Sequence, residues 1–79
     1  MNREEILSKI NEIFQDAFDD DSLEISESTT ANDIEGWDSL MQMNLIEMIE
    51  DEFEFQFTMD EVATLKNVGS IVDVVASHA

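Results

Sequence analysis

Residues 3–18 carry a strongly periodic stripe of apolar positions. The apolar side chains recur at the spacing of one face of an α-helix. They are Ile6, Leu7, Ile10, Ile13, Phe14, Ala17 and Phe18. Asn2 is a good N-cap, and Glu5 stands three residues later, where it completes a capping box. The pattern predicts a first helix over residues 3–18.

The segment from Asp19 to Trp37 is polar and rich in Ser, Thr and Asp, and it shows neither helical nor strand periodicity. Compact domains rarely contain a structureless connection longer than about 12–15 residues unless it is functional or disordered. Apolar residues nevertheless occur in this segment at intervals, at Leu23, Ile25, Ala31, Ile34 and Trp37. We therefore expect a long loop whose spaced apolar side chains hold it against the core.

A second helix is predicted over residues 39–53, with Asp38 as its N-cap. Its core face holds Leu45, Ile46, Ile49 and Phe53, flanked by Met41 and Met48. At about 100° per residue, Leu40 and Met43 fall on the outer face, where an amphipathic helix is normally polar. The same outer face continues with Asn44, Glu47 and Asp51. Two large apolar side chains on this face are therefore not explained by the core.

Residues 53–57 alternate Phe-Glu-Phe-Gln-Phe, which is the period of a strand, but no obvious partner strand exists. Thr58 and Glu61 have capping-box spacing and open a predicted short helix that ends near Leu65. Asn67 can cap a last helix, in which helical spacing relates Val68, Ile71, Val72 and Val75. The β-branched residues of this last segment also favour a strand by propensity, so a small α+β fold is the alternative.

These segments together predict an all-α fold. We expect a small four-helix bundle of three main helices and one short helix, with a long loop between helices 1 and 2. The chain contains no proline, and it shows no internal repeat and no linker. Residues 1–79 are therefore expected to form a single domain.

The charge of the chain excludes several classes of function. Twenty acidic residues stand against three Lys and Arg, which gives a formal net charge of −17. Binding to nucleic acid or to anionic lipid needs a basic surface, so neither is expected, and a partner met through charge should be basic. There is no cysteine and no apolar run long enough to span a bilayer. The first residues lack the basic and apolar regions of a signal peptide, so none is expected. We expect a cytoplasmic protein without membrane insertion.

The residue inventory argues against catalysis and against a metal site. The single histidine, His78, lies near the end of the chain, where fraying is expected and a catalytic base is implausible. Neither Asp19-Asp20-Asp21 nor the segment 33–36 has the ligand spacing of a calcium loop. We therefore expect no catalytic residue and no metal ligand.

The segment Gly36-Trp37-Asp38-Ser39-Leu40 ends the long loop and starts the second helix. Gly36 permits a sharp turn, Asp38 caps the helix, and Ser39 presents a hydroxyl in its first turn. The N-terminus of a helix favours an anion, so a phosphodiester on Ser39 would be stabilised there. Taken alone, Asp-Ser is more simply a capping pair.

Together with the predicted helices and loop, residues 36–40 make the chain resemble the acyl carrier protein family along essentially its whole length. The shared features are the first amphipathic helix, the long polar loop, residues 36–40, the acidic second helix with Glu50-Asp51-Glu52-Phe53, a short third helix and a valine-rich last helix. The resemblance implies a carrier-protein domain over residues 1–79, expected to be a monomer. It also implies that Ser39 carries 4'-phosphopantetheine, transferred from coenzyme A by a phosphopantetheinyl transferase, with Asp38 at the transferase interface.

The terminal thiol of that arm would hold acyl groups as thioesters. The acidic side chains of the second helix would face basic patches on acyl-loading and acyl-processing enzymes, where complementary charge mainly speeds encounter. The partner face implied in this way consists of Leu40, Met41, Met43, Asn44, Glu47, Glu50 and Asp51.

Three positions depart from the pattern of fatty-acid-synthesis carriers. Met41 and Asn44 replace acidic residues, so binding near Ser39 should depend less on charge. Trp37 is bulkier than the residue usual there and is similar to that of stand-alone carriers in specialised pathways, including aminoacyl, D-alanyl and polyketide ones. The cargo and the pathway therefore stay open. The alternative function is an unmodified acidic adaptor that binds a basic protein through Leu40 and Met43.

Overall fold

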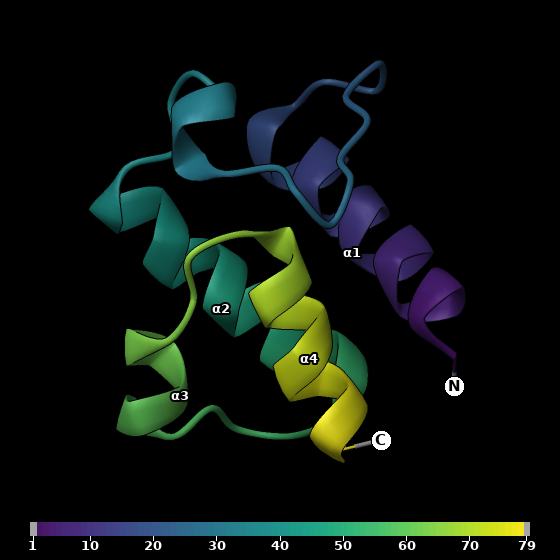
Figure 1. The fold of residues 1–79 in the computed structure, drawn as a ribbon. Coiled ribbons are helices and arrows are strands. Elements are labelled where there is room, and N and C mark those ends of the chain that lie inside the picture. The colour runs from purple at the N-terminus through teal and green to yellow at the C-terminus, as the bar shows by residue number, and fades with distance from the viewer. Residues whose placement is uncertain (1, 79) are drawn as a thin grey trace.

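The first helix forms as its periodicity predicts. A computed structural model of the protein describes residues 2–78, and in it helix α1 spans Arg3–Phe18 (Figure 1). The Asn2 side chain accepts a hydrogen bond from the Glu5 backbone N–H at 2.8 Å, and both halves of the predicted capping box are present. Asp19 ends the helix in the left-handed conformation. Local sequence signals therefore determine both ends of α1.

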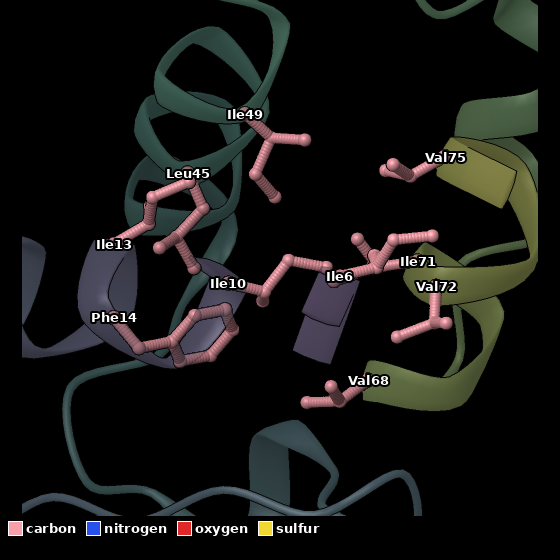
Figure 2. Packing of buried hydrophobic residues seen from close by; sticks show 10 residues of the cluster. All are labelled: Ile6, Ile10, Ile13, Phe14, Leu45, Ile49, Val68, Ile71, Val72 and Val75. Atoms are coloured by element: carbon pink, nitrogen blue, oxygen red, sulfur yellow. The ribbon is translucent and has the colours of Figure 1, made fainter. Parts of the chain in front are cut away.

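The core lies between three helices. Helix α2 spans Ser39–Phe53 and helix α4 spans Val68–His78, and α1 packs against both. Figure 2 shows side chains from all three helices meeting in one cluster. The buried cluster consists of Ile6, Ile10, Ile13, Phe14, Leu45, Ile49, Val68, Ile71, Val72 and Val75. The apolar stripes of the three predicted helices thus form a single core.

The long loop is held against this core. Leu23, Ile25, Ile34 and Trp37 are half-buried and pack on the core cluster, as predicted. Two side chains of α1 also bind the loop backbone: the Asn11 amide oxygen accepts from the Ile25 N–H at 2.8 Å, and the Gln15 amide donates to the Leu23 carbonyl at 3.0 Å. These contacts explain how a long polar segment stays ordered without regular structure of its own.

Ala31 differs from the other loop anchors. It is exposed and begins a short 3₁₀ turn, Ala31–Asp33, so its predicted contact with the core is wrong. The turn is closed by polar groups, because the Thr30 backbone N–H donates to the Asp33 carboxylate at 2.9 Å. The alanine side chain has little apolar surface, so burying it would add too little stability to turn this residue toward the core.

The loop also supports the start of α4. The backbone N–H groups of Val68 and Gly69 donate to the carbonyls of Thr29 and Glu27, at 2.9 and 2.8 Å. A Cβ atom on Gly69 would lie 2.9 Å from the Glu27 carbonyl oxygen, so the close approach requires glycine. Arg3 of α1 also links the loop to α4, because its guanidinium binds both Glu27 and Asp73. These bonds raise the pKa of Arg3.

Residues 54–57 do not form a strand, and residues 2–78 contain no strand at all. Glu54 ends α2 in the left-handed conformation, which redirects the chain. Phe55 and Phe57 then lie half-buried against the core with their ring centroids 4.9 Å apart. Their alternation therefore reflects burial of every second side chain in an irregular segment.

Helices α3 and α4 complete the fold. Helix α3 spans Met59–Ala63 and begins at the predicted capping box of Thr58 and Glu61, and it ends two residues before the predicted end near Leu65. Helix α4 is helical throughout Val68–His78, which excludes the α+β alternative. The observed fold is the predicted all-α bundle of three main helices and one short helix (Figure 1).

Fraying was expected at His78, but this residue lies within α4 and its side chain is held by two contacts. Its ring stacks on Phe55 with centroids 4.6 Å apart, and its Nε2 lies 3.0 Å from a Glu61 carboxylate oxygen. The pKa of Glu61 lies below its usual value because the carboxylate accepts the Thr58 backbone N–H and, second, bonds to His78. The last turn of α4 is therefore tied to the start of α3.

No helix among residues 2–78 has the length and apolar character that would let it cross a membrane. The surface is instead dominated by carboxylates, and the few ion pairs present, such as Lys9 with Glu52 at 3.5 Å, leave most of them without a basic neighbour.

We expect the melting temperature to rise with salt, because a net charge of −17 on so small a chain produces self-repulsion. The Debye length falls from about 30 Å at 0.01 M salt to about 10 Å at 0.1 M, so repulsion between carboxylates more than about 10 Å apart should be largely screened within this range. We expect a gain of roughly 4–8 °C, the shift that about 1 kcal/mol produces in a domain of this size. Thermal melts followed by circular dichroism in NaCl measure it, with a further rise expected in Mg²⁺ or Ca²⁺ at matched ionic strength. Melting that is indifferent to both salts would show that the carboxylates are better compensated than their number suggests.

Candidate functional site

The candidate site is built where the long loop turns into α2. Gly36 adopts φ of 90°, a left-handed value that favours glycine, and this turns the chain toward the helix. The Asp38 backbone N–H donates to the Gly36 carbonyl at 3.1 Å. The Asp38 carboxylate then accepts the Met41 N–H at 2.9 Å, which is the predicted N-cap. Ser39 is consequently the first residue of α2.

The Ser39 side chain is free to react. Its residue is exposed, and within residues 2–78 its hydroxyl has no hydrogen-bond partner. Asp38 performs the capping role, so Ser39 is not needed for it. The unpaired N–H groups and the dipole of a fifteen-residue helix favour negative charge at this end. The structure therefore places an unengaged hydroxyl at the end of α2 that favours negative charge.

Trp37 is fixed between α1 and α2. Its ring meets Phe14 edge-on, with centroids 5.1 Å apart and an interplanar angle of 84°. Its indole N–H donates to the Gln42 side-chain oxygen at 2.6 Å. The sequence pattern identified Trp37 as a loop anchor but missed Gln42, because a single polar residue on a helix carries no periodic signal. The pair links the end of the long loop to the second turn of α2.

A groove of about 530 Å³ opens beside Ser39. One wall comes from the start of α2, with Trp37 just before it, and includes Gln42 and Met43. The other wall comes from α3 and the chain after it, and consists of Val62, Leu65 and Lys66. The sequence pattern does not indicate this second wall, because only folding brings the region around α3 next to Ser39.

The residues implied as a partner face occupy different environments. Leu40 and Met43 are 80% and 60% exposed, which confirms that both face outward. Asn44, Glu47 and Asp51 are also exposed. These five side chains form one outer surface of α2, which we call the α2 outer face.

Met41 and Glu50 are less available than the resemblance implied. Met41 is half-buried against the core, and its sulfur lies 3.9 Å from the Asn44 amide nitrogen. The Glu50 carboxylate accepts the Phe57 backbone N–H at 2.8 Å and so holds the segment after α2. Both side chains have structural contacts that are independent of any partner.

Comparison with known proteins gives the family. Residues 8–75 match the family described as a phosphopantetheine attachment site. The chain is 37% identical over 79 residues to an acyl carrier protein of Lactobacillus acidophilus, and the alignment covers 99% of this chain and 98% of that protein. It is equally identical, over 79 residues, to an acyl carrier protein of Rubrobacter xylanophilus, with 99% and 96% covered.

A solved structure agrees with these relatives. The solution structure of the holo acyl carrier protein from Geobacter metallireducens is 43% identical and superimposes with a TM-score of 0.85. That comparison covers 91% of this chain and 83% of the other. Fold, site and sequence relationship therefore agree: this chain belongs to the acyl carrier protein family, whose members are carriers rather than enzymes.

Proposed function

We propose that this chain carries acyl or aminoacyl intermediates as thioesters on a 4'-phosphopantetheine arm attached to Ser39. The carrying observation is the exposed Ser39 hydroxyl, unengaged in the first turn of α2 beside a groove. The matched family is described as a phosphopantetheine attachment site, and the Geobacter relative is a holo protein, which supports the proposal. Residues 1–79 would act as one carrier domain and as a monomer.

The attachment step uses coenzyme A as donor. The Ser39 oxygen forms a bond to the phosphorus of the phosphopantetheine group, and the pyrophosphate bond of coenzyme A breaks. The remaining nucleotide bisphosphate leaves, and the serine proton passes to a base on the phosphopantetheinyl transferase. When attached, the arm supplies a terminal thiol. It would be the only thiol of the molecule, since the chain has no cysteine.

The proposal is tested by mass spectrometry. The purified chain is incubated with coenzyme A, Mg²⁺ and a broad-specificity phosphopantetheinyl transferase, and the intact mass is measured. We expect one phosphopantetheine increment, which peptide mapping places on the segment containing Ser39. A chain that stays unmodified but binds a basic protein through Leu40 and Met43 would instead support the adaptor function.

The proposed pathway is fatty acid, polyketide or another specialised biosynthesis, with partner enzymes that present basic docking patches. The α2 outer face supports this proposal. An exposed apolar pair next to Ser39, rimmed by Glu47 and Asp51, has the composition of an interface with an apolar centre and a charged rim. Isolated exposed apolar residues are common, but two adjoining the attachment serine are less easily explained by chance.

We expect Met43→Glu to impair modification of Ser39 or later acyl loading while leaving the fold nearly as stable as before. Surface substitutions usually change stability by no more than about 0.5 kcal/mol. The matched control is Met59→Glu, because Met59 is 90% exposed but lies on α3. Initial rates of modification and urea unfolding measure the two effects. If Met43→Glu destabilises the fold by several kcal/mol and is modified normally, the α2 outer face is wrongly assigned.

A further inference from the structure

Lys66 differs from the other two cations of the chain. Arg3 binds Glu27 and Asp73, and Lys9 lies 3.5 Å from Glu52. Lys66 is exposed and has no ion-pair partner within residues 2–78, although the chain has 20 carboxylates. The single uncommitted ammonium among the described residues lines the same groove as Ser39.

Gln42 adds hydrogen-bond donors to this groove. It lies one turn after Ser39 on α2, where residues three apart are neighbours on the helix surface. The Trp37 indole can only donate, so the bond of 2.6 Å identifies the Gln42 oxygen as its acceptor. The Gln42 amide nitrogen has no partner within residues 2–78, so both of its donor hydrogens are unused, and Gln42 is one of the residues that line the groove.

We propose that Lys66 and Gln42 together bind the phosphodiester that joins the arm to Ser39, an inference that rests on the proposed function. A phosphodiester carries one negative charge and oxygen acceptors but no donor. Lys66 and Gln42 offer what such a group lacks, an ammonium and free amide hydrogens, from opposite walls of the groove.

Charge complementarity selects the phosphodiester as the ligand. Modification of Ser39 adds an anion to a chain that already carries −17, next to the Asp38 carboxylate. An unpaired lysine across the groove offsets this repulsion in the modified protein only. Lys66 would thereby hold the first part of the arm against the groove, while the pantetheine portion extends from it.

The test compares melting temperatures before and after modification. Unmodified and modified forms of wild type, Lys66→Gln, Lys66→Arg and Lys9→Gln are melted at 0.02 M NaCl, after mass spectrometry has confirmed complete modification. We expect the change in melting temperature on modification to be about 2–4 °C more favourable in wild type than in Lys66→Gln. Lys66→Arg should keep the wild-type value. Lys9→Gln is the matched control. Lys9 pairs with Glu52 near the far end of α2, so this substitution should lower the melting temperature of the unmodified and the modified form equally.

A second variant tests the other wall. Gln42→Glu keeps an acceptor for the Trp37 indole but replaces the amide donors with negative charge. The change in melting temperature on modification should therefore be less favourable than in wild type. Trp37 fluorescence reports whether the indole contact is preserved. In 1 M NaCl the difference between wild type and Lys66→Gln should vanish, since the Debye length is then about 3 Å.

Each other outcome contradicts the inference. If modification changes the melting temperature equally in wild type and in Lys66→Gln, Lys66 does not contact the attached group. A difference that persists in 1 M NaCl would place Lys66 on the neutral amides of the arm rather than on the phosphodiester. A wild-type chain that takes no mass increment contradicts the proposed function itself, and the two failures are distinguished by the mass spectrum.

Discussion

We expect Ser39→Ala to abolish phosphopantetheine attachment completely while the helical circular dichroism stays unchanged. The hydroxyl is the atom that forms the new bond to phosphorus, and alanine offers no substitute. The fold should be retained because the Ser39 side chain has no partner within residues 2–78, and Asp38 still caps α2. We expect a change in unfolding free energy within about 0.5 kcal/mol, which is usual for a surface substitution.

The matched control for this variant is Ser8→Ala. Ser8 is also an exposed serine within a helix, on α1, and should be irrelevant to modification. Wild type, Ser39→Ala and Ser8→Ala are each incubated with coenzyme A and transferase, and intact mass spectrometry measures the phosphopantetheine increment. A phosphopantetheine increment on Ser39→Ala, or its loss in Ser8→Ala, would move the attachment site elsewhere.

The largest loss of stability is expected from Phe14→Ala. Phe14 is fully buried, with ring centroids 5.9 Å from Phe18 and 5.1 Å from Trp37. Truncation of a buried phenylalanine typically costs about 3–5 kcal/mol, because it removes apolar burial and leaves a cavity. A chain of this length has an expected total stability of roughly 4–12 kcal/mol. Phe14→Ala should therefore remove a large share of the stability, and it should unfold the protein if the total lies at the lower end of this range.

Urea unfolding followed by circular dichroism measures the loss, and Trp37 fluorescence should change in parallel because Phe14 packs against its ring. Phe14→Leu serves as the conservative variant and should lose much less. Met59→Ala removes an apolar side chain that is 90% exposed and should be nearly neutral. A loss below about 1 kcal/mol for Phe14→Ala would mean that the core refills this position far better than buried sites usually do.

Phe14 also connects stability to the site. It supports Trp37, which binds Gln42, and these two residues border the groove beside Ser39. A variant that keeps the helices but loosens Trp37 should modify more slowly than its stability alone explains. The core and the attachment site are thus in physical contact, although their residues come from different helices.

The sequence by itself determined the helices and the place of Ser39, the proposed attachment residue, at the start of α2. Asn2, Asp38 and Thr58 cap α1, α2 and α3 through bonds to residues only three positions away. Apolar periodicity depends equally on local spacing, so it identified the core faces of the three main helices. The position of Ser39 in the first turn of α2 follows from the same local signals, and the exposure of Leu40 and Met43 follows from the helical period.

Tertiary structure decided whatever depends on residues far apart in the chain. The strand-like alternation of residues 53–57 gave no strand, because no second strand was available and the aromatic rings found the core instead. Arg3 meets Glu27 and Asp73, and Ser39 and Lys66 line one groove. Periodicity and capping describe neighbours within about one helical turn, whereas these contacts join residues that only the packing of the whole chain brings together.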